Sequence, residues 1–313
     1  MKNITKNILI FLLALFLIVP VYGQDNRSLE TKVADVLAQF PAQNGEHTAK
    51  LMFQMLETGA PGIAKFCDMI VPPGTGDDTQ ARMALESLAQ LAGSKNHEAD
   101  RKLVESALLA AIEKASDKEV KAFFIRRLQY CGSSASVVVL GKYLNSTDLY
   151  APVLAALESI GTREAGAVIL KMMQDKKDLQ QLAMIKTLGK LKYLPAETFL
   201  IDLTKTANGE LLKHTFAALA SIGGKVSVAT FEVAAKTVGY QPDDAETMAS
   251  YLHYAKRLAE QGETSLSNQL CSTVVKNCIG GNQLICRSEV LAVPGFGTND
   301  LFLKEIKNPD KVY

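Results

Sequence analysis

Apolar positions recur along the middle of the chain at intervals of about 30 residues. The segment 155–161, Ala-Ala-Leu-Glu-Ser-Ile-Gly, returns at 217–223 as Ala-Ala-Leu-Ala-Ser-Ile-Gly. Weaker copies lie at 186–191 and 128–132. The leucines of these copies serve as anchors that are 29, 31 and 31 residues apart: Leu128, Leu157, Leu188 and Leu219. Four copies in series indicate an internal repeat.

The apolar positions around each anchor predict two helices per unit. Residues three before and three after every anchor are apolar, as on one face of a helix. A second apolar set follows twelve residues after the anchors: Leu140, Ile169, Leu200 and Phe231. Gly132, Gly161 and Gly223 stand where the first helix must end, because a left-handed residue favours glycine there. Lys192 takes this place in the third unit, so we expect a differently built turn.

The flanking regions divide the chain further. Residues 1–23 read as a signal peptide, 24–76 as an N-terminal helical cap and 77–313 as the repeat array. Helices are expected at about 29–40, 46–58 and 61–71, before the breaker Pro-Pro-Gly-Thr-Gly at 72–76. Downstream, Leu258 with Gly262 and Leu291 with Gly295 keep the anchor-to-glycine spacing. We expect these outer units to be degenerate copies.

The first 23 residues carry the features of an export signal. Lys2 and Lys6 precede an unbroken apolar run at 8–19, and small residues follow it. A membrane-spanning helix needs about 20 apolar residues, so this shorter run favours a cleaved signal over an anchor. The mature chain would begin at Gln24, with no membrane span, and would be periplasmic or secreted.

Composition narrows the possible partners. The chain has 34 Lys and Arg against 33 Asp and Glu, a formal net charge of +1. That balance gives no field able to hold nucleic acid or an anionic membrane by charge alone. Apolar residues make up 48% of the 313 residues, enough for a packed core, while few aromatic residues favour helix over sheet.

No residue pattern in the chain points to catalysis. The four histidines His47, His97, His214 and His253 are scattered, and no nucleophile elbow, phosphate loop or paired-cysteine metal motif occurs. The pairs Asp77-Asp78 and Asp243-Asp244 stand at expected helix starts, where acidic residues suit the helix dipole. We therefore expect no catalytic residue, no cofactor and no metal.

The five cysteines divide into two groups. Cys131 replaces the core Ile or Leu of other units and Cys67 lies on an apolar helix face, so both read as buried thiols. Cys271, Cys278 and Cys286 are spaced by seven and eight residues. Cys278 and Cys286 flank a Gly-Gly turn, so an exported protein permits a disulfide between them, with core thiols as the alternative.

One row of side chains is a candidate binding strip. In stacked helix pairs the second helix normally lines the concave side. Fourteen and seventeen residues after the anchors this helix would present the following side chains: Lys171, Gln174, Asp202, Lys205 and Lys236. An ordinary solvated face is the alternative.

These repeats, Ala-Ala-Leu-x-Ser-Ile-Gly above all, resemble the HEAT-like repeat family in its short, phycobilisome-lyase-type form. The resemblance implies an all-α fold, a right-handed α-solenoid of stacked antiparallel helix pairs. It is clearest from about 85 to 223. The shared motif is a packing motif, so it transfers no catalytic residue.

The exported chain with these repeats also resembles the N-terminal region of secreted Bacteroidales proteins that carry a 3-keto-disaccharide hydrolase domain. The hypothesis is a non-enzymatic exported scaffold that binds another protein or a companion domain, with any contact to glycan indirect. The alternative is the non-catalytic N-terminal portion of a secreted hydrolase acting on 3-keto-glycosides. Asn-Pro-Asp at 308–310 resembles the entry to one more helix, so we expect a downstream region to complete the stack.

Overall fold

The computed structural model describes residues 26–173, 179–278 and 290–296. The predicted signal at 1–23, the predicted strip residue Gln174, Cys286 and the chain after 296 lie outside the described residues. Within those residues the protein consists of 15 α-helices and two short 3₁₀ turns, with no strand. The prediction of an all-α fold is confirmed.

Five helices build the N-terminal part: α2 (Leu29–Leu37), α3 (Gly45–Glu57), α4 (Gly59–Asp68), α5 (Thr79–Gly93) and α6 (Glu98–Lys114). The proline and glycine segment at 72–76 ends the run of helices, as expected from its residues. It does not interrupt the packing, because α3 contacts α5 and α4 contacts both α5 and α6. The N-terminal helices thus share one apolar core with the helices that follow.

The remaining helices alternate along the chain. One set comprises α7 (Lys118–Cys131), α9 (Tyr150–Ile160), α11 (Leu179–Lys190), α13 (Gly209–Ile222) and α15 (Thr247–Glu260). The other comprises α8 (Ser134–Gly141), α10 (Arg163–Met173), α12 (Glu197–Thr204), α14 (Val228–Thr237) and α16 (Thr264–Asn277). The 3₁₀ turns η1 (Leu194–Ala196) and η2 (Lys225–Ser227) lead into α12 and α14.

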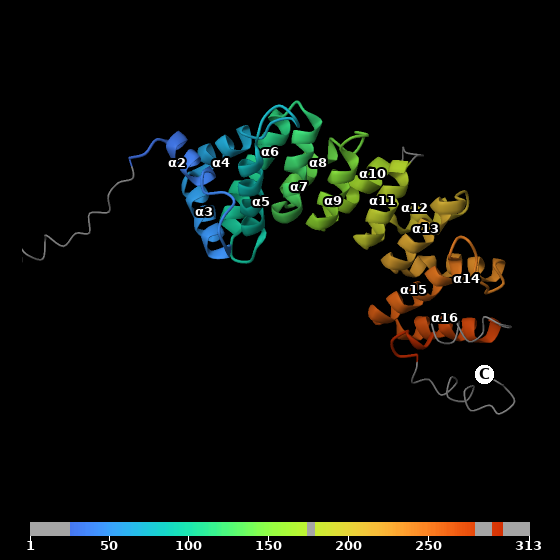
Figure 1. Cartoon of the computed structure of the whole chain (residues 1–313). Coiled ribbons are helices and arrows are strands. Elements are labelled where there is room, and N and C mark those ends of the chain that lie inside the picture. The colour runs from blue at the N-terminus through green and yellow to red at the C-terminus, as the bar shows by residue number, and fades with distance from the viewer. Residues whose placement is uncertain (1–25, 174–178, 279–289, 297–313) are drawn as a thin grey trace, which may run out of the picture.

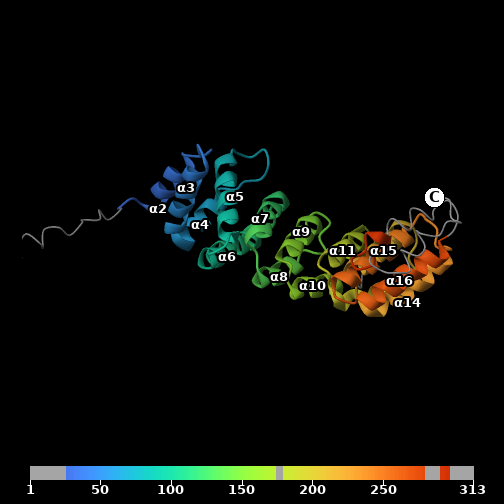
Figure 2. The ribbon, with the colours of Figure 1, turned by 90° about the horizontal axis from the view of Figure 1, so that it is seen from below.

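The helices follow one another along a curved row (Figure 1). Helices α5, α7, α9, α11, α13 and α15 form an inner set in which each member contacts the next. Figure 1 shows α6, α8 and α10 on the outer side of the curve and α7, α9 and α11 on its inner side, and Figure 2 separates the same two sets. Helices close in sequence are therefore also neighbours in space.

The repeat anchors lie in the core. Leu128, Leu157, Leu188 and Leu219 are all fully buried, as are the second-helix residues Leu140, Ile169, Leu200 and Phe231. The prediction that Leu157 and Leu219 occupy core positions is confirmed. Leu258 is also buried, whereas Leu291 is 42% exposed, so the last expected anchor is wrong.

The turns between paired helices differ from expectation in two units. Gly161 and Gly223 are left-handed, with φ of 67° and 71°, as their positions predict. Lys192 is also left-handed, with φ of 50°, and the hydrogen bonds around it form a Schellman motif, Tyr193 N–H to Leu188 O and Lys192 N–H to Gly189 O. The expectation of a different turn there is wrong, because the lysine adopts the conformation usually taken by glycine. Gly132 instead has extended backbone, with φ of −66° and ψ of 153°.

Two buried glutamates connect successive units. Glu105 of α6 is 5% exposed, and its carboxylate accepts hydrogen bonds from Ser133 N at 2.7 Å and Ser136 Oγ at 2.5 Å at the start of α8. Glu197 of α12 is 6% exposed and accepts from Ser227 N and Oγ, both at 2.8 Å, before α14. A carboxylate at a helix start is stabilised by free N–H groups and by the helix dipole.

Exposed ion pairs follow the same spacing. Lys142 pairs with Glu113, Lys118 with Asp148, and Lys190 with Glu158, over separations of 29, 30 and 32 residues. Exposed pairs of this kind contribute at most about 1 kcal/mol each. They therefore mark the contact between neighbouring units more than they hold the units together.

We expect truncation of a repeat anchor to loosen the structure locally. Leu157→Ala and Leu219→Ala should each lower the free energy of unfolding by about 2–5 kcal/mol, because each leaves a cavity in a close-packed core. Hydrogen exchange should rise first in α7, α9 and α11 for Leu157→Ala, and in α11, α13 and α15 for Leu219→Ala. Identical loss of protection along the whole chain in both variants would contradict a core built from neighbouring contacts.

The turn at Lys192 offers a test of backbone strain. A left-handed conformation costs a non-glycine residue about 1–2 kcal/mol, so Lys192→Gly should stabilise the protein by roughly 0.5–1 kcal/mol. Gly161→Ala should destabilise it by about 1 kcal/mol through strain alone, since the nearest atoms to an added Cβ lie at 3.7 Å and 3.9 Å. Urea unfolding followed by circular dichroism measures both changes. Destabilisation by Lys192→Gly would show that the turn is not left-handed.

Candidate functional site

The predicted binding strip lies on exposed side chains of the second helices. Lys171 on α10, Asp202 on α12 and Lys236 on α14 are exposed, as is Lys205 just after α12. Lys205 Nζ lies 2.7 Å from Asp202 Oδ1, and both side chains are about two-thirds exposed, at 68% and 65%. This pair satisfies its own charges within one turn, which suits a solvated face.

Helices α10 and α14, which carry Lys171 and Lys236 of the strip, do not lie on the inner side of the curve. In Figure 1, α10 lies on the outer side of the row and α11 on the inner side, and α14 is likewise outside α15. The expectation that second helices line the concave side is therefore wrong for this chain. The first helices pack directly on one another, α7 on α9, α9 on α11 and α11 on α13.

One strip residue borders a groove. Lys205 lines a depression of about 520 Å³ between α12 and α14, together with Phe216 and Val233. Val233 is 66% exposed, a large value for an apolar side chain in a helix. Lys171 and Lys236 do not line this groove, so the strip residues do not converge on one site.

The titratable groups singled out in the sequence have structural partners. Asp243 accepts hydrogen bonds from Thr247 N at 2.8 Å and Ala245 N at 3.1 Å, which places it at the start of α15 as predicted. Asp77 accepts from Thr79 N at 3.0 Å, and Asp78 accepts from Val71 N at 2.9 Å. Among the described residues, no group of three or more His, Cys, Asp or Glu side chains is arranged to hold a metal ion.

The cysteines behave as two groups. Cys67, Cys131 and Cys271 are free and buried. Burial raises the pKa of the Cys67 thiol to about 12, and burial followed by the nearby Glu105 carboxylate raises that of Cys131 to about 12. Cys278 is disulfide-bonded. Its predicted pairing with Cys286 stays a prediction, because Cys286 lies outside the described residues.

A depression of about 670 Å³, the α4–α6 groove, lies between α4 and α6. Apolar side chains, all but one of them alanines, line it on both sides: Ala60, Ala64, Ala99, Leu103, Ala107 and Ala110. Those from α6 recur every three or four residues, so they form one helical face. Their small size leaves an open channel where longer side chains would fill the space between the helices.

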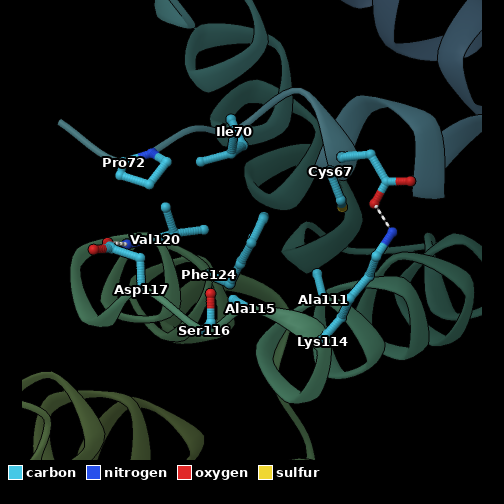
Figure 3. A pocket seen from close by; sticks show the side chains of 11 residues that line it. Cys67, Ile70, Pro72, Ala111, Lys114, Ala115, Ser116, Asp117, Val120 and Phe124 are labelled. Carbon is cyan, nitrogen blue, oxygen red and sulfur yellow. Dashed lines mark hydrogen bonds and ion pairs between the residues drawn. The ribbon is translucent and has the colours of Figure 1, made fainter. Parts of the chain in front are cut away.

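A smaller end pocket of about 340 Å³ continues the groove towards α7 (Figure 3). Ile70 and Pro72 face Val120 and Phe124 across it. The Asp68 carboxylate and the Lys114 ammonium, 2.5 Å apart, lie where the groove and the end pocket meet. The two depressions therefore adjoin, and they share Cys67, Ala111 and this exposed ion pair.

Charge on the groove is unbalanced. Lys114 is paired with Asp68, whereas the exposed Lys102 makes no ion pair with any described residue. Cys67 lines both depressions, but its raised pKa keeps the thiol protonated near neutral pH and so unsuited to nucleophilic attack. The arrangement is suited to binding an apolar, weakly acidic surface. The sequence analysis did not predict this groove, because the pattern of alanines on a helix does not show whether they face another helix or solvent.

No helix in the described part of the chain combines the length and the apolar character needed to cross a bilayer.

The three free thiols provide a test of burial. Burial raises the pKa of Cys271 to about 11, so its thiol, like those of Cys67 and Cys131, is protonated in the folded protein. All three thiols should resist alkylation by iodoacetamide in the folded protein at about pH 8 and react quickly in urea. The thiols ionise near pH 8.5 in the unfolded chain. The stability that the raised pKa values contribute is therefore complete below about pH 8.5 and is lost as the pH rises towards the pKa values of the folded protein. Rapid labelling of folded protein would contradict the burial.

No family model and no curated protein matches the chain.

Proposed function

We propose that this chain is a non-enzymatic, exported repeat scaffold that binds a helical segment of another protein or of a companion domain. In this proposal the helix pairs form a right-handed α-solenoid of HEAT-like repeats, and the signal at 1–23 directs the chain to the periplasm or the exterior. Two observations support the repeat arrangement. Each first helix contacts the next first helix, and the hydrogen bonds between units join residues that are 28 to 32 positions apart.

The α4–α6 groove is the observation that carries the binding function. It is long, apolar and open, and its alanines allow the backbone of another helix to approach closely. The face from Ala99 to Lys114 covers four helical turns, about 22 Å at 1.5 Å per residue. A bound amphipathic helix would lay its apolar face on this surface, as helix-in-groove complexes do.

The charge of the groove indicates which charge the partner helix should carry beside its apolar face. Lys102 is the unpaired cation on the rim among the described residues. An acidic residue beside the apolar face of the partner helix would complement it, and complementary charge chiefly sets orientation and association rate. The proposed partner is therefore an amphipathic helix with an acidic flank.

Peptide selection against the mature chain tests this proposal. Helical peptides selected from a display library should carry an apolar face, and acidic residues should be enriched beside it. Ala64→Glu and Ala110→Glu place a charge in the groove at exposed positions, so they should weaken binding roughly tenfold or more without unfolding the protein. Titration calorimetry measures the affinities.

The matched control is Ala167→Glu, the same change at an exposed alanine on α10, which should leave binding unchanged. Equal binding by the groove variants and the wild type would refute the groove as the binding surface. Robust turnover of ester, peptide, glycoside or 3-keto-glycoside substrates, abolished by one substitution, would refute the non-enzymatic scaffold.

A further inference from the structure

A second concave site lies beside α15, far along the row from α4 and α6 (Figure 1). This α15 pocket has a volume of about 460 Å³ and is formed by segment 240–246, one face of α15, and Ala292 with Val293. Small-molecule sites typically measure about 300–1,000 Å³. Its size and its distance from the α4–α6 groove make it a separate candidate for a small ligand.

The pocket has an apolar floor. Met248, Leu252 and Val293 line it and are almost fully buried, with 6%, 9% and 3% of their surface exposed. Ala249 lies on the same face of α15 and is exposed, so it leaves the pocket open. A ligand with a carbon skeleton would remove water from this surface on binding.

The two carboxylates that line the pocket already have partners. Asp243 accepts from Thr247 N and Thr247 Oγ, both at 2.8 Å. Glu246 lies 2.6 Å from the Lys213 ammonium. Neither carboxylate is available to bind a cation without losing these contacts. Their negative charge opposes an anion in the pocket, and it opposes a ligand with two negative charges more strongly than a ligand with one.

Three further polar side chains line the pocket, and one of them is a cation. Lys256 lines the pocket and makes no ion pair with any described residue. His253, one helical turn before it, has Nε2 3.4 Å from Ser221 Oγ, and burial lowers the pKa of its imidazole, so the ring is neutral near pH 7. Tyr240 contributes a third polar side chain. Beside the two partnered carboxylates, the pocket therefore has one unpaired cation among its described lining residues, which can match one negative charge.

The backbone holds the outer wall in place. Gly239 and Tyr240 are both left-handed, with φ of 61° and 57°. The Tyr240 N–H donates to Ala235 O at 2.9 Å, which ties the segment to α14. A non-glycine residue in this conformation persists only where its surroundings fix it, so the wall is formed before any ligand arrives.

We propose that the α15 pocket binds a small monocarboxylate with an apolar body. Lys256 pairs with the carboxylate, and the floor of Met248, Leu252 and Val293 contacts the carbon skeleton. This site is independent of the proposed protein-binding groove, so either proposal can fail without the other.

Titration calorimetry with 4-phenylbutyrate as the probe tests the proposal, with 4-phenylbutyramide as its uncharged analogue. We expect saturable binding of the acid at one site and roughly tenfold weaker binding of the amide, because a charge-assisted contact is lost. Lys256→Gln should reduce affinity for the acid by the same factor. Ala249→Phe, at an exposed position, should fill the pocket and abolish binding.

Lys276→Gln is the matched control, because Lys276 is an exposed lysine on α16 that does not line the pocket. This variant should bind the acid as the wild type does. The proposal is overturned if the acid does not saturate, if acid and amide bind equally, or if Ala249→Phe leaves binding intact.

Discussion

Each helix pair in this protein has apolar residues on more than one side, and no pair can bury them alone. The anchors Leu128, Leu157, Leu188 and Leu219 are fully buried because each first helix packs between the first helices before and after it. Burial of one such leucine contributes about 1.5–3 kcal/mol, so the array gains stability with every neighbour that covers it. The continuous core, which includes residues from Val33 to Phe296, follows from this constraint.

Polar contacts then determine the register in which one helix pair packs on the next. Glu105 and Glu197 are charged residues in positions that apolar side chains could fill, and leaving such a group unpaired would be costly. Their hydrogen bonds to Ser133 and Ser227 at the following helix starts remove that cost and specify the register between units. Gly189 acts in a complementary way, since an added Cβ would lie only 2.9 Å from Ala218 Cα and would force α11 away from α13.

The two proposed sites arise where this regular packing changes. The α4–α6 groove exists because alanines replace the longer side chains that would close the space between two helices. The α15 pocket exists because the left-handed residues Gly239 and Tyr240 close the end of α14, and the segment that follows lines the pocket together with α15. One site offers a long apolar surface and the other a cavity with a single unpaired cation among its described lining residues. They therefore suit different kinds of ligand.

The sequence by itself determined the helical class, the repeat length and the buried face of each unit, because helix periodicity is a local property that Leu157 and its copies carry unchanged. It also placed Gly161 and Gly223 at left-handed turns, but it misjudged Lys192 and Gly132, since the surrounding hydrogen bonds decide those conformations. Only the tertiary structure placed α10 and α14, the helices that carry Lys171 and Lys236, on the outer side of the curve. It alone brought Ala64 and Ala107 into the lining of one groove and Met248 and Val293 into the lining of one pocket. Residues so far apart in the chain meet only through the way helices stack, and no local pattern encodes that meeting.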